Sequence, residues 1–150
     1  KVIKAHGQFA VGTFKIVPFD TQHDAKEPLG FLIYSTVTKE KLLFATDTYY
    51  VKYLFRGLTH IMVECNYSND ILKTAVEADL TPVALKNRLL SSHFSLENVL
   101  GFLKANDLSS VKSIILLHLS HNNSDEKLFK SEIQKLTGKQ VYIADKGLEV

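Results

Sequence analysis

Four residues of this 150-residue sequence combine a metal-binding side chain with a position at a predicted strand end, in a loop or between helices. Asp47 and His118 each lie at or near the end of an apolar run, His23 lies in a polar loop, and His93 lies between two predicted helices. Ligands at strand ends and in loops can meet at one edge of a sheet. Imidazole and carboxylate groups suit zinc or manganese. We therefore interpret these residues as candidates for one site.

Each candidate also has an ordinary structural interpretation. Asp47 could be the N-cap of a helix over residues 48–55, and His118 could be a core or strand-end histidine. His23 could belong to an unremarkable polar loop. His93, which we place at the start of a helix, could be a surface cap residue or could help the free backbone N–H groups there to bind an anion. The residue types alone leave both interpretations open.

Other reactive residues give weaker signals. Glu64 ends a buried run, where it could simply pair with a lysine or an arginine. Cys65 follows it and is expected to be a small buried hydrophobic residue. The sequence contains neither a serine nucleophile elbow nor a phosphate-loop motif. Nucleophilic serine or cysteine chemistry is therefore not favoured.

Composition excludes several classes of protein. The chain is 45% hydrophobic and 23% charged, which is wrong for a disordered segment. Its single cysteine excludes a disulfide framework and fits a reducing, cytoplasmic environment. A net charge of +2 is too small to indicate nucleic-acid binding by itself. No apolar run is long enough to span a membrane, so we expect no membrane association.

Hydrophobic spacing predicts one α/β domain over residues 1–150. The predicted strands cover residues 8–19 (interrupted at Gly12-Thr13), 30–38, 41–46, 60–64, 113–119 and 141–144, and the predicted helices cover residues 69–78, 82–90, 95–104 and 124–136. Ser95 and Ser124 are predicted N-caps, and Gly138 is the predicted C-terminal stop of the last helix. Strands followed by helices that alternate with strands indicate a layered fold.

Five motifs in a fixed order give a more specific indication. They are His23-Asp24-Ala25 with Pro28-x-Gly30-Phe31, Ala45-Thr46-Asp47-Thr48, Glu64-x-Asn66-Tyr67, Arg88 with His93-x-Ser95, and Leu117-His118-Leu119-Ser120-x-Asn122-Asn123. Over about residues 14–123 the sequence resembles the metallo-β-lactamase superfamily. It looks most like the YycJ/WalJ-type hydrolases, which are related to the ribonuclease Z and phosphodiesterase branch. The resemblance implies a metallo-β-lactamase-like αββα sandwich, of which this chain is the C-terminal part only.

The resemblance also implies roles for the four candidates. His23 would be a metal-binding histidine, Asp47 would bridge two divalent ions (zinc or manganese), and His118 would be the last ligand, on the second ion. His93 would match a catalytic histidine that handles the scissile phosphate. In such a site a metal-bound hydroxide attacks phosphorus in line while the ions neutralise charge. A nearby imidazole protonates the leaving oxygen.

One hallmark of the superfamily, His-x-His-x-Asp-His, is absent from the 150 residues. We expect it before Lys1. The only methionine is Met62, which agrees with a chain that is processed or is part of a longer one. We therefore expect the chain alone to be inactive, and the missing sheet to come from the N-terminal segment or from a partner chain.

The predicted function of the intact protein is metal-dependent hydrolysis of phosphodiester bonds, most simply as a DNA or RNA nuclease. Lys52, Arg56, Lys86 and Arg88 could contact phosphates, although each could equally belong to a solvated surface. Two alternatives stay open. One is a non-catalytic binding or scaffold domain of the same fold, and the other is a small-molecule hydrolase of the lactonase or thioesterase type.

Overall fold

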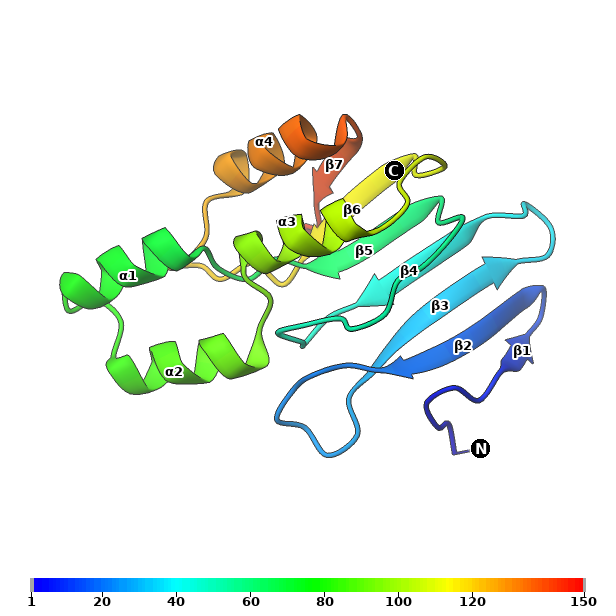
Figure 1. Ribbon diagram of the computed structural model, residues 1–150, viewed down its shortest axis with the longest axis horizontal. Helices are drawn as coiled ribbons and strands as arrows, with labels where there is room; N and C mark the ends of the chain where they lie inside the picture. The colour runs from blue at the N-terminus through cyan, green and yellow to red at the C-terminus, as the bar shows by residue number, and fades with distance from the viewer. Residues whose placement is uncertain (1, 150) are drawn as a thin grey trace.

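The computed structural model describes residues 2–149, which form one seven-stranded sheet with strands in sequence order (Figure 1). The strands are β1 (Phe9–Val11), β2 (Phe14–Asp20), β3 (Leu29–Ser35), β4 (Lys41–Ala45), β5 (His60–Glu64), β6 (Ser113–Leu117) and β7 (Gln140–Ile143). Strands β1 to β4 pair antiparallel, and β4 to β7 pair parallel. The carboxyl ends of β4 to β7 therefore lie at the same edge of the sheet.

The antiparallel half follows the sequence prediction. Gly12 adopts a positive φ of 55° in the turn between β1 and β2, where the predicted strand is interrupted. Strands β3 and β4 form the predicted hairpin, and Lys39 in its turn also has a positive φ. Gly30 in β3 lies directly against the Phe19 ring. A Cβ added at this position would come within 2.4 Å of the ring. The missing side chain therefore lets β2 and β3 pack closely.

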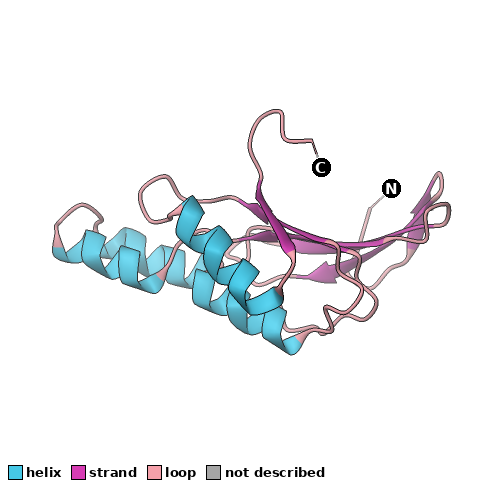
Figure 2. Cartoon of the chain, turned by 90° about the horizontal axis from the view of Figure 1, so that it is seen from above, coloured by secondary structure: helices cyan, strands magenta, loops and turns pink. Residues whose placement is uncertain are grey.

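Four helices follow β5 and β6. They are α1 (Asn69–Glu77), α2 (Val83–Ser92), α3 (Leu96–Ala105) and α4 (Glu126–Thr137). Helices α3 and α4 pack on one face of the sheet (Figure 2), and α1 and α2 lie beyond the carboxyl ends of the strands (Figure 1). Ser95 caps α3 as predicted, and Gly138 ends α4 in the left-handed conformation. The prediction of Ser124 as the cap of α4 was wrong. Asp125 is the N-cap, and the Ser124 hydroxyl instead donates to the Ser120 carbonyl at 2.6 Å. Within residues 2–149, no helix combines the length and the apolar character needed to cross a membrane.

The core lies between the sheet and the helical layer. Alternate residues of the central strands point into it, and α3 and α4 supply the opposite side. The fully buried members include Leu43, Ala45, Ile61, Val63, Ile114, Leu116, Val99, Leu103, Phe129 and Ile133. Each large apolar side chain buried in this way stabilises the fold by about 1.5–3 kcal/mol. This layer holds the strand ends in fixed positions.

The other face of the sheet is apolar but carries no helix among the described residues (Figure 2). Leu42, Phe44, Met62 and Tyr142 are only partly buried on it, in the positions that alternate with core residues. A shallow hollow of about 370 Å³ is lined by several of these side chains. One sheet and one helical layer are thus present, which is half of a four-layer αββα arrangement.

The segment after β4 is irregular, so the alternative prediction of a helix over residues 48–55 is wrong. Thr48 explains why. Its backbone N–H donates to the Glu64 carboxylate at 2.9 Å, and its hydroxyl donates to the Tyr50 carbonyl at 2.7 Å. Tertiary hydrogen bonds therefore replace the local bonds of a helix. The segment then crosses the helical side of the sheet, where Val51 and Leu58 are buried.

Candidate metal centre

Five polar side chains meet at the carboxyl edge of the sheet. Asp47 follows β4, Glu64 ends β5, and His118 follows β6. Val63 pairs with Ala45 on one side and with Leu116 on the other, so these strand ends are level. His23 lies in the loop after β2, and His93 lies between α2 and α3.

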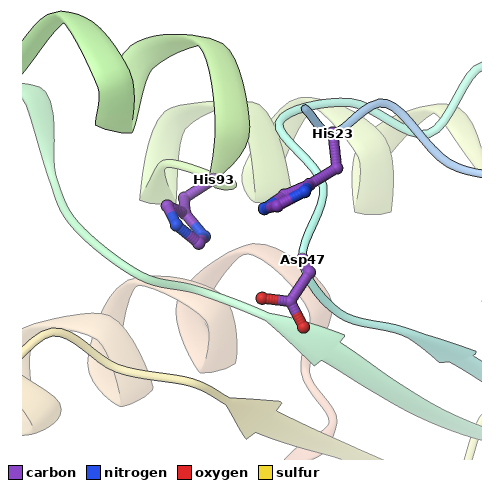
Figure 3. Close-up of side chains that lie close together, drawn as sticks. All are labelled: His23, Asp47 and His93. Carbon is purple, nitrogen blue, oxygen red and sulfur yellow. The ribbon is translucent and has the colours of Figure 1, made fainter. Parts of the chain in front are cut away.

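The side chains are close enough to share a ligand. His23, Asp47 and His93 each offer an atom within 4.8 Å of the others, and Figure 3 shows them pointing toward one another. Glu64, His93 and His118 form a second such group. His118 Nδ1 lies 3.5 Å from Asp47 Oδ1, which joins the two groups. The structure therefore brings all four sequence candidates together, including the three predicted metal ligands.

Glu64 is the centre of this cluster, and sequence reasoning missed its role. Its side chain is fully buried. Oε1 accepts from His93 Nδ1 at 2.6 Å and from His118 Nδ1 at 3.0 Å, while Oε2 accepts from the Thr48 backbone N–H at 2.9 Å. The interpretation of Glu64 as the partner of a lysine or an arginine is wrong, because neither lies within ion-pair distance of it among the described residues. Both rings are held through Nδ1, which leaves each Nε2 for a metal ion or a substrate.

Two short backbone contacts bring His93 to Glu64. The Asn66 N–H donates to the Phe94 carbonyl at 2.8 Å, and the Leu96 N–H donates to the Tyr67 carbonyl at 2.7 Å. The chain between the two helices is thereby fixed beside the chain that leaves β5. The predicted position of His93 at a helix N-terminus was wrong, because His93 is the C-cap of α2, with an extended backbone. The extended conformation turns its ring to the sheet edge.

The backbone at two of the candidates is unusual. Asp47 has a φ of 52° and His118 has a φ of 53°, in the left-handed region that few non-glycine residues adopt. Such conformations cost about 1–3 kcal/mol each and persist where surrounding contacts enforce them. The Asn66 side chain provides one such contact, since its Nδ2 donates to the His118 carbonyl at 2.7 Å. Positive φ also occurs at His6, Lys39 and Asp79, away from the cluster, so this conformation orients the two side chains and does not by itself mark a site.

His23 is fixed within its own loop. Its Nδ1 lies 2.9 Å from the Asp24 carboxylate and 3.1 Å from the Ala25 backbone nitrogen. The loop itself is joined to the segment after β4, since the Gln22 N–H donates to the Thr48 hydroxyl at 2.9 Å. These contacts occupy Nδ1, so Nε2 is the His23 atom left for a ligand.

The buried carboxylate also sets the protonation of the site. The hydrogen bond to Glu64 raises the pKa of His93, while partial burial and the positive charge of Arg88 oppose this shift. Burial raises the pKa of the Cys65 thiol strongly, so this residue stays protonated and does not act as a thiolate ligand. The structure confirms that Cys65 is a buried hydrophobic residue.

The donor set fits a divalent metal ion. Neutral imidazoles and carboxylates at this separation are typical ligands of zinc, manganese or iron. About half of the Asp47 side chain is exposed, so the cluster is open on one side.

No protein-family model and no curated protein matches this sequence. Solved structures do share the fold. The metallo-β-lactamase fold protein YhfI from Bacillus subtilis aligns with a TM-score of 0.71 at 15% identity, over 97% of this chain and 53% of YhfI. CmlA from Streptomyces venezuelae, a diiron β-hydroxylase, aligns with a TM-score of 0.60 at 10% identity, over 93% of this chain and 32% of CmlA.

These similarities confirm the predicted fold class. The seven-stranded sheet and four helices match a metallo-β-lactamase fold. The chain spans about half the length of YhfI and about a third of CmlA.

Proposed function

We propose that this chain supplies part of the metal centre of a hydrolase that cleaves phosphodiester bonds. The observation that carries the proposal is the convergence of His23, Asp47, His93 and His118 on one sheet edge around the buried carboxylate of Glu64. A metal-binding role also agrees with the similarity between the fold of this chain and the metallo-β-lactamase fold of YhfI. The finer assignment to YycJ/WalJ-type nucleases rests on the sequence motifs.

In this proposal His23, Asp47 and His118 would hold divalent ions, zinc or manganese. Bound ions would supply the nucleophile and neutralise the charge that develops on phosphorus. The chain's own residues orient the groups around the ions. Glu64 fixes the rings of His93 and His118 through Nδ1, so that the Nε2 atoms keep one orientation.

His93 is the proton donor in this scheme. Its Nδ1 proton is held by Glu64, which favours the imidazolium form, and Nε2 carries the proton that can pass to the leaving oxygen. An alkoxide leaving group needs such a proton, since it is a strong base. Partial burial of His93, which is 15% exposed, keeps water away from the transferred proton.

The open sheet face supports the proposal that the chain is one half of a sandwich domain. Partly buried Leu42, Phe44, Met62 and Tyr142 leave apolar area on a face that lacks a helix in the described part of the chain. Apolar sheet faces of this size are normally packed against another layer. We infer that a second sheet covers this face in the intact protein and brings the remaining metal ligands, from the same chain or from a partner.

The test is hydrolysis by the intact protein with added Zn²⁺ or Mn²⁺. Labelled DNA and RNA oligonucleotides are compared with a lactone and a thioester. The proposal expects cleavage of an oligonucleotide, which Asp47→Ala abolishes and Glu40→Ala leaves unchanged. Cleavage of only the lactone or thioester would replace the substrate class. A protein that binds neither Zn²⁺ nor Mn²⁺ and hydrolyses none of these substrates would favour a scaffold domain.

A further inference from the structure

We propose that Arg88 binds a phosphate-type oxyanion beside the metal centre and so selects anionic substrates. The inference rests on the proposed function and adds a substrate-binding residue to it. Arg88 lies on α2, five residues before His93, and its side chain is 69% exposed. Its position and its available donors carry the argument.

The position comes from a short chain of contacts. Arg88 Nε lies 3.7 Å from Asp24 Oδ2, and the other oxygen of Asp24 lies 2.9 Å from His23 Nδ1. One carboxylate therefore separates the guanidinium from a candidate metal ligand. Arg88 therefore lies at the outer side of His23, one carboxylate away from the cluster.

The other basic candidates have different surroundings. Lys52 forms an ion pair with Asp20 and lies 5.2 Å from the centre of the Tyr53 ring. Arg56 lies at the opposite edge of the sheet, where its carbonyl accepts from Lys41 at the start of β4. Among Lys52, Arg56, Lys86 and Arg88, only Arg88 makes an ion pair with a residue that contacts the cluster, within residues 2–149.

The chemistry of the side chain fits a phosphate group. A guanidinium has five N–H donors in a planar fork, which can bind two oxygens of a phosphate at once. The 3.7 Å contact to Asp24 is longer than a hydrogen bond, so it leaves these donors available. The guanidinium also keeps its positive charge throughout the pH range of a folded protein, so it is available to an anion that approaches the cluster.

The experiment measures binding of inorganic phosphate to the metal-loaded intact protein by isothermal titration calorimetry. Arg88→Gln is expected to weaken phosphate binding about tenfold or more, which corresponds to the loss of one charged hydrogen-bonding pair. Arg88→Lys should lose less, since it keeps the charge without the fork. Lys73→Gln on the neighbouring helix α1 is the control and should bind as the unmodified protein does. Equal binding by Arg88→Gln and the unmodified protein would overturn the proposal.

A second variant separates anion binding from a purely structural role. If Arg88 only fixes the His23 loop through Asp24, then Asp24→Asn should weaken phosphate binding as much as Arg88→Gln does, and this result would overturn the proposal. If Arg88 binds the anion, Asp24→Asn should leave binding equal or tighter, because it frees the guanidinium. Acetate, titrated in parallel, should show less dependence on Arg88 than phosphate does. Arg88-dependent phosphate binding without any phosphodiester hydrolysis would support this inference and contradict the proposed function.

Discussion

The two ends of strand β5 carry the same residue types in different surroundings. At the carboxyl end, buried Glu64 accepts hydrogen bonds from two histidines and from a backbone N–H. At the amino end, His60 contacts Glu40 at 3.4 Å and the Ser113 hydroxyl at 2.8 Å. Lys112 also bonds to Glu40, at 2.8 Å. Only the first end has the geometry of a metal centre.

The two ends of β5 differ in the groups that compensate the negative charge of the carboxylate. Glu40 is 35% exposed, and hydrogen bonds from Lys112, Thr38 and His60 lower its pKa to about 2. Its charge is therefore satisfied by a lysine and by water. Glu64 has no access to solvent, and its side-chain partners are histidines. A buried charge needs compensation, which protonated imidazoles or a bound metal ion can provide. A lysine thus compensates Glu40, whereas among the described residues no lysine or arginine lies within ion-pair distance of Glu64.

The largest expected effect is at Asp47. In the intact protein, Asp47→Ala should reduce phosphodiester hydrolysis about a thousandfold or more, because stabilisation by a metal ion contributes several kcal/mol to the transition state. Metal content, measured by elemental analysis, should fall in parallel. The matched change at the other end of β5, Glu40→Ala, should alter neither. Hydrolysis within a few-fold of the unmodified protein after loss of Asp47 would remove it from the site.

A smaller effect is expected at Glu64. Glu64→Gln keeps the size of the side chain and an acceptor for the Thr48 N–H, but it removes the charged acceptor shared by His93 and His118. Loss of such a partner typically costs about 10–100-fold in metal affinity. Zinc titration in competition with a chromophoric chelator measures the change. Unaltered affinity would mean that Glu64 has only a structural role.

The metal-free protein should show a pH dependence that comes from His93. Its pKa is raised above the ordinary value of 6.5 by the hydrogen bond to Glu64. The pair therefore stabilises the fold fully below about pH 6.5, and this stabilisation is lost as the pH rises through the raised pKa. Titration of the His93 ring signals by NMR measures the shift, and Glu64→Gln should remove it. Zinc binding should strengthen over the same rise in pH, because loss of the His93 proton removes a positive charge that repels the ion.

The smallest effects are expected at the amino end of β5. Glu40→Gln and Lys112→Met break an exposed ion pair, and exposed pairs contribute little to stability. Melting temperature and zinc affinity should both stay essentially unchanged. A marked loss of zinc affinity in either variant would contradict the distinction between the two ends.

The sequence predicted the parts of this molecule that depend on local pattern. Alternating apolar residues indicated the hairpin, and Gly138 indicated the end of α4. The motifs around His23, Asp47 and His118 indicated the strand ends that meet. These features need no knowledge of how distant segments pair.

What the sequence could not predict depends on tertiary contacts. The irregular chain after Asp47 is fixed by the bond from Thr48 to Glu64, which is 16 residues away. The role of Glu64 follows from the level pairing of β5 with its neighbours, and its signal was visible only as an acid that ends a buried run. His93 reaches the site because Phe94 pairs with Asn66, a contact that helix spacing does not encode.

The most direct test of the metal centre is paramagnetic broadening of the histidine ring signals by Mn²⁺, which also detects weak binding by the chain itself. As Mn²⁺ is added, signals of His23, His93 and His118 should broaden first, while those of His60 should keep their width. Asp47→Ala should suppress the broadening at all three rings. Equal broadening of His60, or none at the three rings, would contradict a metal centre at the carboxyl edge of the sheet.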